Sequence, residues 1–260
     1  ITAEGVSAVP DSVNQQMMQN FRQGGAAINV LCRSNKIDFL SYDAGIDRPT
    51  RNFLHEPAMS ESETVEAFVL GWGSVPQFTD VFAVGEMGIG NTTPSVAILS
   101  AITGVTSDSI IGRGTGLTDD ALARKSRTIR QALANRSSEL SSPLSILASV
   151  GGREIAAMTG AILRAVSMRI PVVLDGVIAG AAAAIAFEIQ PASRSCCLAG
   201  HRSAEPAHDS FLRHYGLEPL LDLRMRLGEG SGAAVAMGIV RNAVDSFHQM
   251  ATFAQAGVVI

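Results

Sequence analysis

The sequence predicts an α/β fold built on a mostly parallel sheet, and three observations lead to this prediction. Short apolar runs alternate with longer capped segments along the 260 residues. A turn of glycine and polar residues follows most of the apolar runs. A chain of this length can also bury a substantial core without disulfides or a structural metal. Strands that alternate with helices favour a parallel sheet with right-handed crossovers.

Five short apolar runs are predicted to be strands because turn residues bound them. The run at 172–174 is apolar throughout and ends at Asp175-Gly176. The five predicted strands are 37–42, 81–84, 172–174, 195–198 and 220–223.

The first helices are predicted from signals at their ends. Asp11 or Ser12 caps a helix that stops at the glycine pair 24–25. Ser60 and Glu63 have the spacing of a capping box, which predicts a helix from there through Leu70.

Pro94 suits the first position of the next helix, which ends at Gly104. Thr118 caps a polar helix that contains Lys125. Further helices are expected at about 154–165, at 178–187 and over a long segment that closes the chain.

Composition and charge exclude several classes of protein. The net charge is −4, and no basic stripe of the kind that binds nucleic acid is present. Aromatic residues make up only 5% of the chain, which disfavours stacking platforms for single strands. The three cysteines do not form a disulfide framework. Their pattern is typical of small buried residues in a reducing cytosol, so a cytoplasmic protein is expected. The most apolar stretch, 170–189, contains charges, and its uncharged run is too short to span a bilayer.

Polar residues follow five of the apolar runs, where a strand is predicted to pass into a loop or helix. They are Asp43, Glu86, Asp175, Ser203 and Glu229. In open parallel sheets, ligands bind at the carboxyl ends of the strands. The sequence therefore predicts that the chemistry takes place at this edge.

Residues 85–93 (GEMGIGNTT) form the strongest local motif. Its three glycines let backbone N–H groups approach an anion, and the helix that follows directs its positive end at the same place. The spacing matches neither the dinucleotide fingerprint nor a P-loop. From the residues alone, an ordinary tight turn and a phosphate site are about equally favoured. Glu86 would repel a phosphate and is expected to face a sugar hydroxyl or a base.

Glu229 lies between two glycines in residues 228–232 (GEGSG), before the last helix. The serine is out of place for a nucleophile elbow, so a serine hydrolase is rejected. The glycines give the backbone freedom to present one acid, but a helix cap explains the pattern equally well.

Three other candidates also have structural explanations. Lys125 is flanked by arginines at 124, 127 and 130, which is typical of a solvated basic face. Asp175 could hydrogen-bond a ligand or cap a helix. The histidines at 201, 208 and 214 lack the spacing of zinc ligands.

The motif at 85–93 resembles the family of nicotinate-nucleotide:dimethylbenzimidazole phosphoribosyltransferases, which make the lower-ligand nucleotide of cobalamin. The resemblance extends in the family's order from one end of the chain to the other, and its motifs are specific. The other matching blocks are 24–29, 151–158, 174–176, 200–206 and 226–230.

The resemblance implies a Rossmann-like sheet with a small helical domain, a homodimer and a reaction without a cofactor or metal. It implies that Glu229 is the general base and that Glu86 assists near the ribose or base. The substrates would be small molecules, with neither nucleic acid nor membrane as a partner. The implied substrate-binding residues are Gly88 and Lys125 at the 5′-phosphate, Gly90, Asp175 and Ser203 at the mononucleotide, and Leu227 on the aromatic base.

The expected organisation is an α/β nucleotide-binding domain at 1–232 and a C-terminal helical segment at 233–260. Because the chain begins at Ile1, we expect a family segment that precedes it and contributes to the base pocket and helical domain. Two other functions remain open from the sequence: the same fold acting on another base, such as adenine or a phenol, and a non-catalytic fragment that binds the mononucleotide. A dehydrogenase is disfavoured because the dinucleotide fingerprint is lacking.

Overall fold

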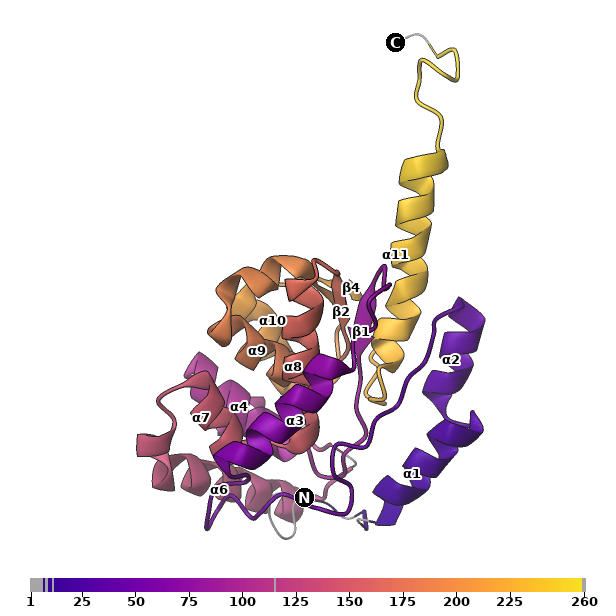
Figure 1. Ribbon diagram of the computed structural model, residues 1–260. Helices are drawn as coiled ribbons and strands as arrows, with labels where there is room; N and C mark the ends of the chain where they lie inside the picture. The colour runs from indigo at the N-terminus through magenta and orange to yellow at the C-terminus, as the bar shows by residue number, and fades with distance from the viewer. Residues whose placement is uncertain (1–6, 8, 11, 115, 259–260) are drawn as a thin grey trace.

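A computed structural model describes residues 7, 9–10, 12–114 and 116–258. Its centre is a four-stranded parallel sheet in the order β1-β2-β3-β4 (Figure 1). The strands are β1 (Phe82–Val84), β2 (Val172–Leu174), β3 (Cys197–His201) and β4 (Pro219–Leu221). Each strand pairs with the next one along the chain, and Val84 is in register with Leu174 and Leu174 with Ala199. The predicted α/β class and parallel sheet are confirmed.

The sequential strand order determines where the connecting helices lie. Right-handed crossovers between successive parallel strands place their helices on one face of the sheet. Accordingly α8 (Arg153–Ser167), α9 (Val177–Ile189) and α10 (Pro206–Tyr215) lie on one side of the strands and α11 (Ser231–Gln249) on the other (Figure 1). The other helices are α1 (Ser12–Gln23), α2 (Ala27–Asn35), α3 (Glu61–Gly73), α4 (Thr92–Thr103), α5 (Ser107–Ile110), α6 (Asp119–Asn135) and α7 (Pro143–Val150), with 3₁₀ turns η1 (Ser137–Glu139) and η2 (Pro191–Cys196).

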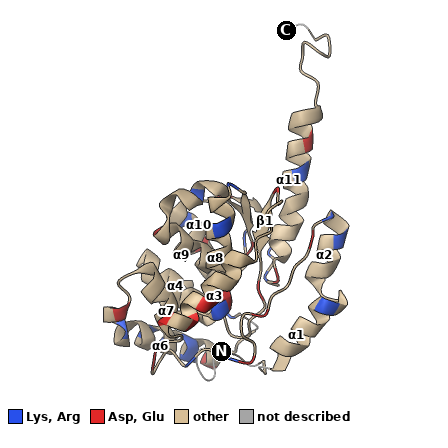
Figure 2. Ribbon diagram, in the orientation of Figure 1, with Lys and Arg blue, Asp and Glu red and all other residues tan. Residues whose placement is uncertain are grey.

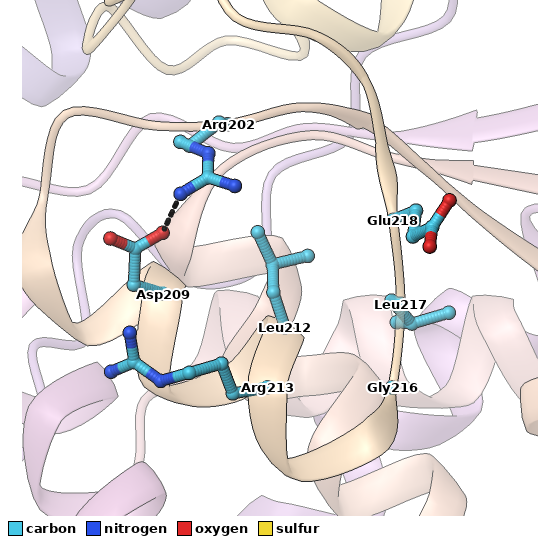
Figure 3. Close-up of a pocket in the computed structure, with 7 residues that line it drawn as sticks. All are labelled: Arg202, Asp209, Leu212, Arg213, Gly216, Leu217 and Glu218. Carbon is cyan, nitrogen blue, oxygen red and sulfur yellow. Dashed lines mark hydrogen bonds and ion pairs between the residues drawn. The ribbon is translucent and has the colours of Figure 1, made fainter.

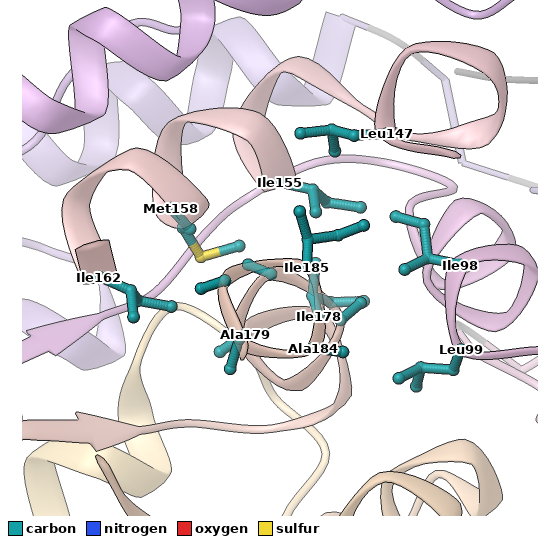
Figure 4. Close-up of a cluster of buried hydrophobic side chains, with 14 of the residues drawn as sticks. Ile98, Leu99, Leu147, Ile155, Met158, Ile162, Ile178, Ala179, Ala184 and Ile185 are labelled. Carbon is teal, nitrogen blue, oxygen red and sulfur yellow. The ribbon is translucent and has the colours of Figure 1, made fainter. Parts of the chain in front are cut away.

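The main core surrounds α9, which is apolar on all sides over its first eleven residues. A helix of this kind is stable only when it is enclosed, and every residue from Val177 to Phe187 is buried. Ile178 and Ile185 of α9 lie among side chains of α4, α7 and α8 (Figure 4). The predicted helix at 178–187 is thus the central element of the core.

Helix α11 contacts the opposite face of the sheet only along its N-terminal half. Gly200 allows this close approach, because a Cβ at that position would lie 3.1 Å from the Cα of Ala233. The C-terminal half of α11 extends away from the rest of the chain (Figure 1), and Phe247 is 83% exposed there. The division of the chain at 232/233 stays a prediction.

Several local predictions are confirmed. Ser60 and Glu63 form the capping box of α3, and Thr118 accepts a hydrogen bond from the backbone of Ala121 at the start of α6. The strand predicted at 172–174 is observed with those bounds, and Gly104 ends α4 in the left-handed conformation.

Other local predictions are wrong. Residues 37–42 are not a strand, because that segment passes outside the sheet and pairs with none of the four strands. Helix α4 begins at Thr92, two residues before Pro94. The strand expected at 195–198 starts at Cys197 because a 3₁₀ turn occupies the preceding residues. Of the two caps proposed for α1, Asp11 lies outside the described residues.

Charged residues are spread over the helices and loops rather than gathered on one element (Figure 2). Within the described ranges, none of the helices is long and apolar enough to cross a membrane.

Helices α3 and α8 cross at a contact that only glycine permits. A Cβ on Gly71 would lie 1.7 Å from the carbonyl oxygen of Ala157, and one on Gly160 would lie 2.1 Å from that of Phe68. These positions let the backbones of the two helices touch.

We predict that Gly71→Ala destabilises the protein by about 1–3 kcal/mol, because the methyl group overlaps the backbone of α8. Gly73, on the same helix, has open space around it and provides the matched control. Gly73→Ala should leave stability unchanged or raise it by up to about 1 kcal/mol. Urea unfolding of both variants tests the pair, and equal effects would contradict the close crossing.

Candidate functional site

The loop after β1 lies directly on the segment that precedes α11. A Cβ on Gly85 would be 2.3 Å from the backbone nitrogen of Gly230, so these two segments can meet this closely only at a glycine. The backbone N–H of Glu229 donates to the carbonyl of Glu86 at 3.0 Å. Asn14 of α1 accepts from the N–H of Ile89 at 3.1 Å and holds the other end of the loop. The two predicted catalytic residues are thus brought together through their backbones.

Glu229 has an unusual backbone conformation. Its φ is 64°, and both Gly228 and Gly230 have φ of 84°. The left-handed conformation costs a residue with a Cβ about 1–2 kcal/mol, so the surrounding contacts must impose it. A single strained acid between two glycines is a feature that function often explains.

The Glu229 carboxylate lies at the N-terminus of α2. Its Oε2 accepts from the backbone N–H of Ile28, the second residue of that helix, at 3.3 Å. Unpaired N–H groups and the helix dipole both favour a negative charge at this place. Glu229 therefore has one anchored oxygen and, within the described residues, no side-chain hydrogen bond to Oε1.

The glycine-rich block at 24–29 contains no obvious catalytic group, and the structure explains its presence. It forms the turn between α1 and α2 and aims the start of α2 at Glu229. Asn29 stabilises this turn, since its side-chain oxygen accepts from the N–H of Ala26 and its amide donates to the carbonyl of Phe21. The sequence did not predict α2, whose role is carried by backbone atoms.

An acidic cluster lies beside this loop. The amide of Asn91 donates to Oε2 of Glu86 and also hydrogen-bonds Glu154 of α8. Burial raises the pKa of Glu86 to about 8, and the charges of Glu154 and Asp175 add to this rise against the Asn91 hydrogen bond. Burial likewise raises the pKa of Glu154. Gly88 lies against the cluster, because its Cβ would be 2.7 Å from the Asn91 amide.

Lys125 is fully buried on the inner face of α6, whereas Arg124, Arg127 and Arg130 are exposed. The solvated basic face therefore consists of the three arginines without the lysine. The Lys125 Nζ donates to Oγ1 of Thr92 at 2.9 Å and to the carbonyl of Gly112 at 3.2 Å.

Burial lowers the pKa of Lys125 to about 8, and the carboxylate of Glu205 opposes this change. Thr92 is the first residue of α4, so the ammonium group lies beside the helix end that follows the glycine motif. Gly88 and Lys125, the two predicted phosphate ligands, thus lie in surroundings of opposite charge.

Asp175 caps a helix, although not the one that follows it in sequence. Its Oδ1 accepts from the N–H groups of Gly232 and Ala233 at 2.7 and 3.1 Å, at the start of α11. The same oxygen is 3.4 Å from Nε2 of His201. With 4% exposure, Asp175 links β2, β3 and α11 at the carboxyl edge.

Ser203 is also buried and lies in the turn between β3 and α10. Its backbone N–H donates to Nδ1 of His208 at 2.9 Å, and its hydroxyl accepts from the N–H of Glu205 at 3.3 Å. Burial lowers the pKa of His208 to about 3, so this ring is neutral and accepts through Nδ1.

The remaining predicted residues lie at the rim. Leu227 is 58% exposed, immediately before Gly228, and so presents an apolar side chain next to the Glu229 turn. Gly90 has φ of 86° and turns the chain into α4.

A surface pocket of about 330 Å³ lies elsewhere, between α10 and the segment leading to β4 (Figure 3). Arg202 on its wall is 3.0 Å from Asp209, and its other lining residues include Arg213 and Glu218. None of the predicted site residues lines it. The predicted residues lie instead around the carboxyl edge of the sheet, which remains the candidate site.

Sequence reasoning missed Asn91, Thr92, Glu154, Glu205 and the loop at 112–114. Four of these five lie inside motifs that were recognised, so their position in the sequence was a usable signal. The loop at 112–114 (Gly-Arg-Gly) belongs to none of the recognised motifs. Its relation to Lys125 is a tertiary contact.

The chain is similar to proteins of one family over nearly its whole length. A family model described as "Phosphoribosyltransferase" matches residues 1–258. A protein of Cereibacter sphaeroides named nicotinate-nucleotide–dimethylbenzimidazole phosphoribosyltransferase is 49% identical over 99% of this chain and 76% of its own length. A protein of the same name from Methylocella silvestris is 48% identical over the same shares.

The fold is likewise similar to a solved structure. The crystal structure of CobT from Thermus thermophilus superposes with a TM-score of 0.91 at 38% sequence identity. The match covers 98% of this chain and 82% of that one.

The raised pKa of Glu86 predicts that Glu86→Gln increases the stability of the protein by an amount that depends on pH. A carboxyl whose pKa rises from 4.5 to about 8 on folding binds its proton more tightly in the folded state. Its contribution to stability is therefore complete below pH 4.5 and is lost as pH rises to about 8, by at most about 1.4 kcal/mol per pH unit. Glutamine keeps the acceptor for Asn91 without the charge, so the variant should gain stability over the parent between pH 5 and 8. Thermal unfolding of the variant and the parent at pH 5 and at pH 8 tests this. A difference in stability that is the same at both pH values would refute the prediction.

Proposed function

This chain belongs to the phosphoribosyltransferase family of those relatives, and we propose that it transfers 5-phosphoribosyl from nicotinate mononucleotide to 5,6-dimethylbenzimidazole. The products would be α-ribazole 5′-phosphate and nicotinate, within cobalamin biosynthesis. The observation that best supports this proposal is the Glu229 turn. One strained carboxylate is anchored by a helix N-terminus at the carboxyl edge of a parallel sheet.

The reaction exchanges one aromatic nitrogen for another at C1′ of the ribose. The bond from C1′ to the nicotinate nitrogen breaks, and its electron pair neutralises the cationic ring. The bond from the benzimidazole nitrogen to C1′ forms on the opposite face, which inverts the β-nucleotide to the α-nucleotide. The N–H proton of the incoming base must be removed, and it passes to the carboxylate and then to solvent.

Glu229 is suited to take this proton. Its Oε2 is anchored by Ile28, which fixes the orientation of the carboxylate and leaves Oε1 to accept the proton. General-base help of this kind contributes about 10²–10⁴-fold to the rate. Leu227, two residues earlier and exposed, would contact the face of the aromatic base.

The phosphate end of the substrate would lie at the start of α4. Lys125 provides a positive charge there, and the unpaired N–H groups of a helix N-terminus favour an anion. Among the described residues, Thr92 and Gly112 accept from two of the three Lys125 N–H groups, and the third would bind the ligand. Gly88 and Gly90 would let the backbone approach the mononucleotide.

The acids would act at the other end of the same substrate. Glu86 lies between the Glu229 turn and Asn91 and would face the ribose or base. Asp175 and Ser203 would support the mononucleotide site from beneath, because both are buried and hold the loops that surround it.

We also propose that the protein acts in the cytoplasm as a homodimer. The outer half of α11 exposes Val244 and Phe247, and Met250 is exposed directly after the helix. A second copy would remove these apolar side chains from water. Sedimentation of the purified protein measures the oligomeric state directly, and a monomer at micromolar concentration would reject the dimer.

Glu229→Gln is expected to lower the transfer rate by at least about 100-fold, because glutamine accepts the Ile28 hydrogen bond but cannot take a proton. Nicotinate mononucleotide should still bind with near-parental affinity in calorimetry. Glu218→Gln, an exposed change in the pocket of Figure 3, serves as the control and should have no effect. A Glu229→Gln rate within about tenfold of the parent would exclude the general-base role.

Lys125→Met is expected to weaken nicotinate mononucleotide by about tenfold to a hundredfold, since a charged hydrogen bond to the phosphate contributes about 1.5–3 kcal/mol. Methionine retains most of the buried volume. The matched control is Arg127→Met, which removes an exposed charge from the same helix. Equal losses for the mononucleotide and for its phosphate-free nucleoside would show that Lys125 does not contact the phosphate.

A further inference from the structure

We propose that Glu205 is a positioning residue for the phosphate end of the site: it holds the loop at 112–114 in place and keeps Lys125 in its charged form. This inference rests on the proposed role of Lys125 as the phosphate ligand. It assigns a function to a buried acid in the turn before α10, outside the acidic cluster around Glu86.

Glu205 is buried and reaches from the start of α10 into the 112–114 loop. It is 8% exposed, and its Oε1 accepts from the backbone N–H of Gly114 at 3.1 Å. A Cβ on Gly112 would lie 1.8 Å from its Oε2, so the loop passes directly over the carboxylate. Because Ser203 accepts from the N–H of Glu205, the base of the side chain is also fixed.

The same loop contacts Lys125 and the start of α4. The carbonyl of Gly112 accepts from the Lys125 Nζ, and a Cβ on Gly114 would lie 3.0 Å from Oγ1 of Thr92. Glu205 thus acts on the ammonium group in two ways, through the loop that supplies its acceptor and through charge.

Glu205 is the acidic group whose charge opposes the effect of burial on the pKa of Lys125. Among the described elements packed around Lys125, α4 contributes the neutral Thr92 and the 112–114 loop contributes Arg113. Helix α5 contributes Asp108, which pairs with Arg130 of α6. Arg113 is 2.5 Å from Asp119 of α6, so these two charges balance one another. The carboxylate of Glu205 raises the pKa of Lys125, which burial has lowered to about 8. Without this carboxylate the lysine would lose its proton closer to neutral pH.

The Glu205 carboxylate also has a direct effect on a phosphate ligand, and this effect opposes the benefit of keeping Lys125 protonated. A carboxylate near the phosphate repels it, so removal of the charge favours binding as long as Lys125 remains protonated. The two effects separate with pH. At low pH only the lost repulsion is felt, and at higher pH the loss of the lysine proton dominates.

The test is calorimetric titration of nicotinate mononucleotide into the parent protein and Glu205→Gln from pH 6 to pH 8.5. Glutamine is isosteric and still accepts from Gly114. The phosphate of the ligand titrates identically in both experiments, so its contribution cancels in the ratio of the variant Kd to the parent Kd. The ratio therefore reports only protonation changes in the protein. The ratio should be at or below one at pH 6. If the Lys125 pKa falls by one unit, the protonated fraction at pH 8 falls from about one half to about one tenth, and the ratio rises about fivefold.

Three comparisons make the outcome decisive. Glu205→Asp retains the charge and should show the same trend at smaller amplitude, which gives a second measurement if the glutamine variant folds poorly. In a Lys125→Met background, Glu205→Gln should give a ratio that does not change with pH. Glu218→Gln, an exposed acid beyond α10, should give a constant ratio near one.

A constant ratio for both Glu205 variants would overturn the inference. If these ratios are constant but Lys125→Met weakens binding of the mononucleotide more than binding of its nucleoside, only the role of Glu205 is rejected. If Lys125→Met weakens both ligands equally, the phosphate assignment of Lys125 fails, whatever the Glu205 ratios show.

Discussion

The rest of the site depends on how the N-terminus of α11 is held against the carboxyl edge of the sheet. Asp175, at the end of β2, accepts from two N–H groups of that helix, and Gly85 contacts Gly230 backbone to backbone. A capping hydrogen bond to a charged oxygen contributes about 1–2 kcal/mol, and here it joins elements distant in sequence. The residue placed by this junction is Glu229.

The junction also explains why Glu229 adopts a left-handed conformation. Its N–H is drawn to the carbonyl of Glu86 and its carboxylate to the N–H of Ile28, so both ends of the residue are fixed from opposite sides. Strain held in this way keeps a side chain in one orientation. Helices α2 and α11 therefore act as supports for a single side chain.

Two groups of charged side chains lie at the sheet edge. Glu86 and Glu154 share Asn91, and Lys125 and Glu205 share the 112–114 loop. Burial raises the pKa of the acids and lowers that of the lysine, so each group is less charged than it would be in water.

The sequence by itself determined the α/β class, the strand at 172–174, the capping box of α3 and the family, because these follow from local patterns and from motifs in a fixed order. It also indicated Glu86, Glu229 and Lys125 as candidates, without separating function from caps and solvated faces. Only the tertiary structure decided that Asp175 caps α11 and that Lys125 is buried apart from its arginine neighbours. It alone placed the start of α2 at Glu229 and excluded residues 37–42 from the sheet. The physical reason is that hydrogen-bond partners and burial at these positions come from segments 30 to 200 residues away, and a local pattern carries no record of them.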